Sequence, residues 1–264
     1  QLVPIISTGG ELIQKAYLVP AIVTIVSVVA LFASLGNRNQ FNLVLSIYII
    51  AAAYYFVYQL CQKPKPWWVL LGSMFATILI LRSPILDLFI WFFRQVLPGR
   101  IASGQTSFFS VLIGTFFGAG LMEELLKALP VLAAWRIGME LKYPWRDRIG
   151  VWEPLDGILL GSASAVGFTL LETLGQYVPN IIQNVTLQAG ADAGELVGLQ
   201  LLIPRILGSA AGHMAYSGYL GYFIGLSALK PKKRWQILGV GYFSASALHA
   251  LWNASGTVSV LLLA

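Results

Sequence analysis

The sequence predicts an all-α protein, a polytopic transmembrane helix bundle of about seven spans plus one interfacial helix. Of its 264 residues, 57% are hydrophobic and 11% are charged, whereas soluble domains carry about 25% charged residues. Apolar runs recur from Tyr17 to the end of the chain, and Lys and Arg gather in the short segments between them. So few charges could not cover the surface of a soluble domain, and they exclude an ordinary nucleic-acid-binding domain.

The spans follow from run length, because a helix needs about 20 mostly apolar residues to cross a bilayer. The expected spans are Tyr17–Leu35, Phe41–Cys61, Trp67–Leu81, Ser107–Trp135, Leu155–Val178, Val197–Leu229 and Trp235–Leu263. The run Ile85–Leu97 is short and contains Asp87 and Arg94, so we expect it to lie in the membrane interface. We therefore divide the chain into peripheral helices over residues 1–106 and a four-helix core over residues 107–264.

Loop charges predict the orientation. Residues 136–153 and 230–234 are rich in Lys and Arg, whereas residues 179–195 have neither. The positive-inside rule then places the N-terminus in the cytoplasm and the C-terminus outside. Residues 82–106 contain three arginines and fall on the outer side, against the rule.

Small residues predict close helix packing in the second half of the chain. In the fourth to sixth expected spans, four Gly-x-x-x-Gly pairs begin at Gly114, Gly157, Gly208 and Gly221. Glycines at this spacing let helix backbones approach each other closely in lipid. We therefore expect a tight bundle there.

Ionisable residues occur within the last four predicted spans, where each costs about 2.5–3.5 kcal/mol or more near the bilayer centre. They are Glu123, Glu124, Lys127, Glu172, Arg205, His213 and His249. Gathering them around one hydrated cavity costs less than burying each alone. We therefore predict a shared polar site.

The run Glu123-Glu124-Leu-Leu-Lys127 places Lys127 one helical turn from both carboxylates. One glutamate can pair with the lysine, and the other stays available as a general base. A purely structural ion pair is the alternative interpretation.

The later motifs each place a polar group within a span. Phe168 precedes Glu172 by four residues, and the two histidines are followed one turn later by Ser217 and Asn253. Each of these alone could be a satisfied core residue. Arg205 lies about two turns before His213 and is either a counter-ion or a residue that reaches toward the interface.

Residue types exclude several other membrane chemistries. The chain lacks His-Glu-x-x-His, has no pair of intramembrane aspartates and has a single cysteine, Cys61. A Ser/His dyad of Ser162 or Ser164 with His249 is possible, but it would leave the glutamates without a role.

Over residues 107–257 the motifs resemble the PrsW family of intramembrane proteases, which is related to the CAAX prenyl proteases and bacteriocin-processing enzymes. The resemblance rests on Glu-Glu-x-x-Lys at 123–127, Phe-x-x-x-Glu at 168–172, His213 and His249-x-x-x-Asn253. It implies that the four-helix core is catalytic and hydrolyses peptide bonds without a covalent intermediate. Glu123 would then be the base, with Glu172 or a histidine assisting.

The resemblance also implies that Lys127 holds Glu124 and that His213, or His249 with Asn253, stabilises the oxyanion. It implies a transmembrane or membrane-anchored substrate, such as an anti-sigma-factor-like or lipidated protein, and an integral location, in a prokaryotic plasma membrane. No cofactor is expected in this mechanism.

Three alternatives remain. A metal-dependent protease would hold Zn with Glu123, Glu172, His213 and His249, which are suitable ligand types. A proton-coupled carrier would also place such groups in a bundle. A non-catalytic scaffold would tolerate the loss of the glutamate pair.

Overall fold

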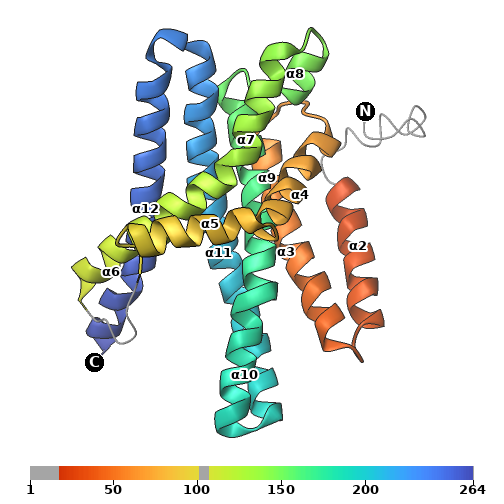
Figure 1. Cartoon of the computed structure of the whole chain (residues 1–264). Helices are drawn as coiled ribbons and strands as arrows, with labels where there is room; N and C mark the ends of the chain where they lie inside the picture. Colours follow the sequence, from red (N-terminus) through yellow and green to blue (C-terminus); the bar gives the residue numbers. More distant parts are fainter. Residues whose placement is uncertain (1–17, 101–106, 264) are drawn as a thin grey trace. The chain divides into compact units, whose positions relative to one another are not determined.

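The computed structural model describes residues 18–100 and 107–263, apart from some side chains. Within these ranges all regular secondary structure is helical (Figure 1). The chain divides into two compact units. The first contains residues up to 60 together with 169–211, and the second contains residues 61–168 and 212–264. We describe each unit by itself.

The first unit contains the first two helices of the described residues, α2 (Leu18–Ala33) and α3 (Arg38–Cys61). Thr24 Oγ1 and Tyr48 hydroxyl, 3.1 Å apart, join them. Both helices expose large apolar side chains, such as Phe32 and Phe56. Lipid contact explains such exposure better than water does.

The predicted outer loop 179–195 is largely helical, which corrects the fifth span. A π-helical turn η4 (Thr173–Tyr177) follows α9 (Pro154–Glu172) and leads into α10 (Val178–Ala189), and α11 (Ala191–Leu229) follows. The helix passes Pro179 because this proline lies in the first turn of α10, where a missing N–H costs little.

Three helical stretches in the described part of the chain are long and apolar enough to cross a membrane: Asn39–Cys61, Phe108–Glu140 and Pro154–Gln188. The pair Trp67–Leu81 and Pro84–Val96 passes together as a broken span, bent by 64°. Three to four candidate spans are therefore shown, and the count of seven stays a prediction.

Beyond this bend lies a short helix, close to the short run expected at residues 85–97. The second unit begins with α4 (Trp67–Leu81), followed by α5 (Pro84–Trp91) and the π-helical η2 (Phe92–Val96). Ser83 caps α5 by accepting from the Ile85 N–H at 3.3 Å, and Pro84 occupies the first turn. The chain therefore leaves the direction of α4 at Ser83.

The rest of the second unit surrounds the predicted site. Its remaining helices are α6 (Phe108–Thr115), η3 (Phe116–Leu121), α7 (Met122–Glu140), α8 (Trp145–Ile149), η5 (Pro231–Lys233) and α12 (Arg234–Leu263), with the first part of α9 and the second part of α11. In Figure 1, α11 and α12 run side by side up to their joining turn, and α7 crosses obliquely.

Glycines bring α9 and α11 into backbone contact, as the spacing predicted. A Cβ on Gly157 would collide with the Gly221 carbonyl, and a Cβ on Gly161 would collide with the carbonyl of Ser217. Gly225 likewise packs on the backbone of Glu153. Gly208 differs, since a Cβ added there would meet nothing within 4 Å.

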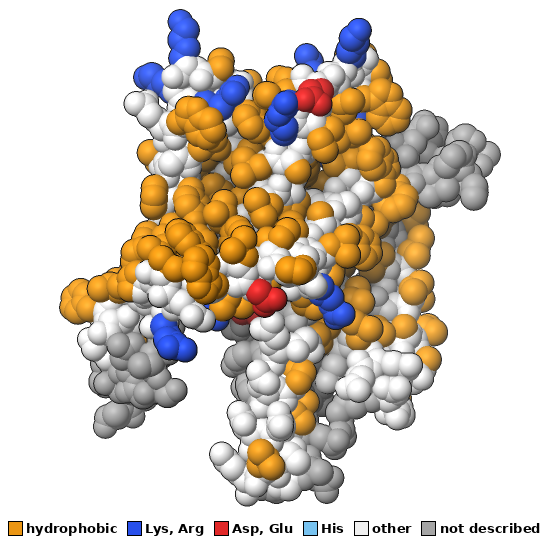
Figure 2. All heavy atoms as spheres, in the orientation of Figure 1, with side chains coloured by type: hydrophobic (Ala, Val, Ile, Leu, Met, Phe, Trp, Pro, Cys, Tyr) orange, Lys and Arg blue, Asp and Glu red, His pale blue; other side chains and the backbone are white. Residues whose placement is uncertain are grey.

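Basic segments meet at one end of the second unit. Lys65 is buried and donates to Asp156 Oδ1 at 2.9 Å and to the Gly150 carbonyl, and Lys63 pairs with Glu153. Burial lowers the pKa of the Lys65 ammonium, and Asp156 partly offsets this. Figure 2 shows Lys and Arg gathered over α8 and the α11–α12 turn, above a broad hydrophobic surface. The basic segments of this unit that were predicted to be cytoplasmic therefore share one end.

Candidate active site

A wide helical turn introduces the glutamate pair. The π-helical segment η3 leads directly into α7, so that Glu123 and Glu124 occupy the first turn of α7. Gly120 in η3 packs against the Ser246 backbone of α12, where a Cβ would collide. This close approach places both carboxylates beside α12, and π-helical turns are frequent at functional sites.

Glu124 is completely buried and accepts three charge-assisted or hydroxyl hydrogen bonds. Lys127 Nζ donates to its Oε1 at 2.6 Å, His249 Nδ1 lies 2.8 Å from the same oxygen, and Ser217 donates to Oε2 at 2.9 Å. The predicted pairing of Lys127 with the second glutamate is confirmed. Glu124 therefore fixes the positions of groups from α7, α11 and α12.

The two imidazoles stand at right angles. Their ring centroids are 5.0 Å apart, with an interplanar angle of 85°. Lys127 Nζ lies 2.9 Å from His213 Nδ1 and 4.7 Å from the centre of the Phe168 ring, which also contacts His213 at 5.0 Å. One face of His213 is thus held by Phe168 and one nitrogen by Lys127.

Glu123 completes a cluster of possible metal ligands. Its Oε2 lies 3.7 Å from His249 Nε2, the nitrogen that does not face Glu124. One ligand atom from each of Glu123, His213 and His249 lies within 4.8 Å of the others. The three residues come from α7, α11 and α12, so this convergence exists only in the folded chain.

A family model described as PrsW family intramembrane metalloprotease matches residues 65–264. The chain belongs to the PrsW family. It is therefore an integral membrane enzyme that hydrolyses peptide bonds of a protein substrate. Neither the curated proteins nor the solved structures contain a significant match to it.

This PrsW-family protease contains a site residue that the sequence motifs do not include. Tyr216 stacks on His249 with ring centroids 5.1 Å apart and an interplanar angle of 17°. Tyr216 belongs to the same turn of α11 as His213 and Ser217. The three-residue spacing from His213 was the available signal, since residues at i and i+3 share a helix face.

The remaining predicted residues are placed differently. Glu172 lies in the first unit, where Ser209 donates to its Oε2 at 3.4 Å. Asn253 is exposed on α12, one turn beyond His249. Ser217 binds Glu124, whereas the sequence suggested a role beside His213. The side chain of Arg205 lies outside the described residues.

Proposed function

We propose that this PrsW-family protease is metal-dependent and that Glu123, His213 and His249 hold the metal. The convergence of these three ligand atoms within 4.8 Å carries the proposal. The family description supports it, because that description names a metalloprotease. The sequence motifs alone favour a metal-free reaction, with zinc as the alternative.

The donor set fits a catalytic zinc ion. Three protein ligands of carboxylate and imidazole type leave one coordination position for water, which is the pattern of catalytic zinc sites. When bound, such an ion lowers the pKa of its water to about 7 and polarises the scissile carbonyl. Glu172, which the sequence had included among the ligands, lies in the first unit, and its role as a ligand stays a prediction.

The residues behind the ligands would orient them. Glu124 accepts from His249 Nδ1, which turns Nε2 of that ring toward Glu123. Such carboxylate–histidine pairs fix the ring orientation of metal ligands. Tyr216 and Phe168 hold the two imidazole planes through ring contacts.

A metal-free reaction is the second candidate, and the lysine contact favours it. When the Lys127 ammonium donates to His213 Nδ1, the ring proton lies on Nε2. That N–H cannot bind a metal but can donate to an oxyanion. Glu123 would then deprotonate water, because Glu124 is already committed to Lys127, His249 and Ser217.

We further propose that the substrate is a transmembrane or membrane-anchored protein of the anti-sigma-factor-like or lipidated kind. We also propose that the chain crosses a prokaryotic plasma membrane seven times, with its N-terminus in the cytoplasm and its C-terminus outside. Residues 107–264 would form the catalytic core. Gathering of the basic segments at one end supports this orientation. Assisting roles for Glu172, Arg205 and Asn253 remain proposals from the sequence.

The experiment combines metal analysis with cleavage. The purified full chain in proteoliposomes is incubated with transmembrane and lipidated peptides, with and without a strong chelator, and its metal content is measured by mass spectrometry. We expect bound zinc that is lost in His249→Gln, and cleavage that stops with the chelator and returns with zinc. The matched control Asp147→Asn removes an exposed carboxylate in α8, beyond the C-terminal end of α7, and should behave as wild type.

The outcomes separate the candidates. Cleavage that persists without metal but is lost in Glu123→Gln would support the metal-free reaction. Cleavage that survives Glu123→Gln, His213→Gln and His249→Gln alike would exclude both mechanisms.

A further inference from the structure

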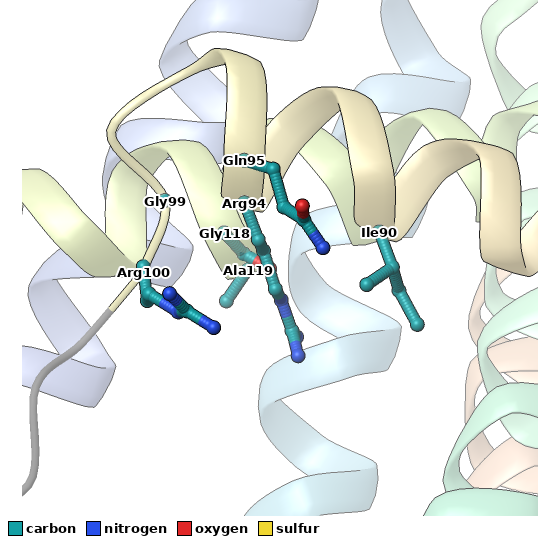
Figure 3. Close-up of a pocket in the computed structure, with 7 residues that line it drawn as sticks. All are labelled: Ile90, Arg94, Gln95, Gly99, Arg100, Gly118 and Ala119. Carbon is teal, nitrogen blue, oxygen red and sulfur yellow. The ribbon is translucent and has the colours of Figure 1, made fainter.

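A pocket lined by two arginines lies beside the π-helical turn that precedes the glutamates. Its volume is about 360 Å³, which is within the range of small-ligand sites. The lining residues are Ile90, Arg94, Gln95, Gly99, Arg100, Gly118 and Ala119. Figure 3 shows the side chains of Arg94, Gln95 and Arg100 directed to the same side of the ribbon.

Two glycines make the backbone approach that shapes the pocket. A Cβ on Gly99 would lie 2.7 Å from Gly118 Cα, so the segment after η2 rests directly on η3. Arg94 Nε and Nη2 then donate to the Gly118 carbonyl at 3.3 and 3.1 Å. These bonds fix the guanidinium plane at the rim of the pocket.

The charge of the pocket suits an anion. Among the described residues, none of those lining it is acidic, whereas two are arginines and one is a glutamine that can donate. Guanidinium groups bind phosphate and carboxylate groups in bidentate geometry. The exposed Arg94 and Arg100 therefore offer donors to an anion from outside the protein.

The surroundings favour a lipid over an acidic peptide. Leu88, Trp91, Phe92 and Val96 on the same short helical segment are exposed, which suits acyl chains. The pocket is also separated from the basic end by α7, whose 19 residues span about 28 Å. In the proposed orientation, on which this step rests, these arginines lie on the outer side against the positive-inside rule, and a bound anion would offset their charge.

We propose that the Arg94–Arg100 pocket binds the phosphate of a phospholipid headgroup. The acyl chains lie along the exposed apolar side chains of α5 and η2. On the cytoplasmic side of membranes, basic pockets between transmembrane helices bind lipid headgroups through the same charge complementarity. Because Arg94 also holds the Gly118 carbonyl, the bound lipid steadies η3, which ends just before α7 and Glu123.

Native mass spectrometry of the delipidated full chain tests the proposal. Phosphatidylglycerol and a diacylglycerol with the same acyl chains are added separately, so that the two probes differ in the phosphate-containing headgroup. We expect one retained phosphatidylglycerol and no retained diacylglycerol. Arg100→Gln removes a pocket cation without touching the Arg94–Gly118 bonds and should weaken retention about tenfold, as expected for one charged hydrogen bond.

Arg82→Gln is the matched control, because Arg82 follows α4 and does not line the pocket. Arg94→Gln should weaken retention at least as much as Arg100→Gln. Equal retention of diacylglycerol, or equal loss in Arg82→Gln, would overturn the proposal. Binding of glycerophosphate as tight as that of phosphatidylglycerol, or displacement of the lipid by an acidic peptide, would also overturn the assignment to a phospholipid.

Discussion

Changing each of the two adjacent glutamates to glutamine should have different effects. Glu124→Gln should mainly lower stability, whereas Glu123→Gln should mainly abolish cleavage. Glu124 is fully buried and lies 2.6 Å from the equally buried Lys127 ammonium. Glu124→Gln replaces one accepting oxygen with an NH₂ group and removes the charge. The lysine then lacks the negative charge of Glu124, and His213 Nδ1 lies 2.9 Å from its ammonium.

Breaking a buried ion pair by removing one partner costs about 3–5 kcal/mol. For a chain of this size, about 2–4 °C of melting temperature corresponds to 1 kcal/mol. Glu124→Gln should therefore lower the melting temperature by about 6–20 °C. Glu123 lies 3.7 Å from His249 and is less deeply buried than Glu124, so Glu123→Gln should cost much less stability and abolish cleavage.

The assay is thermal unfolding of both variants in one detergent, followed by cleavage of a membrane-anchored peptide well below the lower melting temperature. Circular dichroism at that temperature controls for folding. Equal melting temperatures for the two variants would refute the division of roles. Full cleavage by Glu123→Gln would refute it as well.

The other predictions concern packing and hydrogen bonds. Gly157→Ala should strongly destabilise the chain, because its Cβ would collide with backbone, whereas the control Gly208→Ala should be neutral; equal melting temperatures would contradict the packing argument. Ser217→Ala removes one hydrogen bond to Glu124 and should lower the free energy of unfolding, measured with a chemical denaturant, by about 1–3 kcal/mol. An unchanged free energy of unfolding would show that this hydrogen bond is dispensable. Asp156→Ala should lower the free energy of unfolding by about 3–5 kcal/mol, because it leaves Lys65 buried without its carboxylate partner. Proteolysis of the 142–153 segment should then accelerate. An unchanged rate of proteolysis would argue against a stabilising role for this ion pair.

Sequence reasoning succeeded where a local rule decides the outcome. Apolar run length predicted the helices, including a short one near residues 85–97. Helical spacing predicted that Lys127 pairs with one of the two glutamates, because residues three or four apart share one face of a helix, and the structure shows that the partner is Glu124. The predicted end of the fifth span at Val178 was wrong, because Pro179 lies in the first turn of α10, where a helix tolerates proline.

By itself, the sequence determined that the chain is helical, belongs in a membrane and carries acidic and imidazole groups at membrane depth. Spacing along one helix cannot say which side chains of other helices will approach it. Only the tertiary structure decided that Glu124 serves as the anchor, that Glu123, His213 and His249 converge, and that Tyr216 supports the cluster. Those contacts depend on the close approach of α7, α11 and α12, which the glycine contacts of the folded backbone permit.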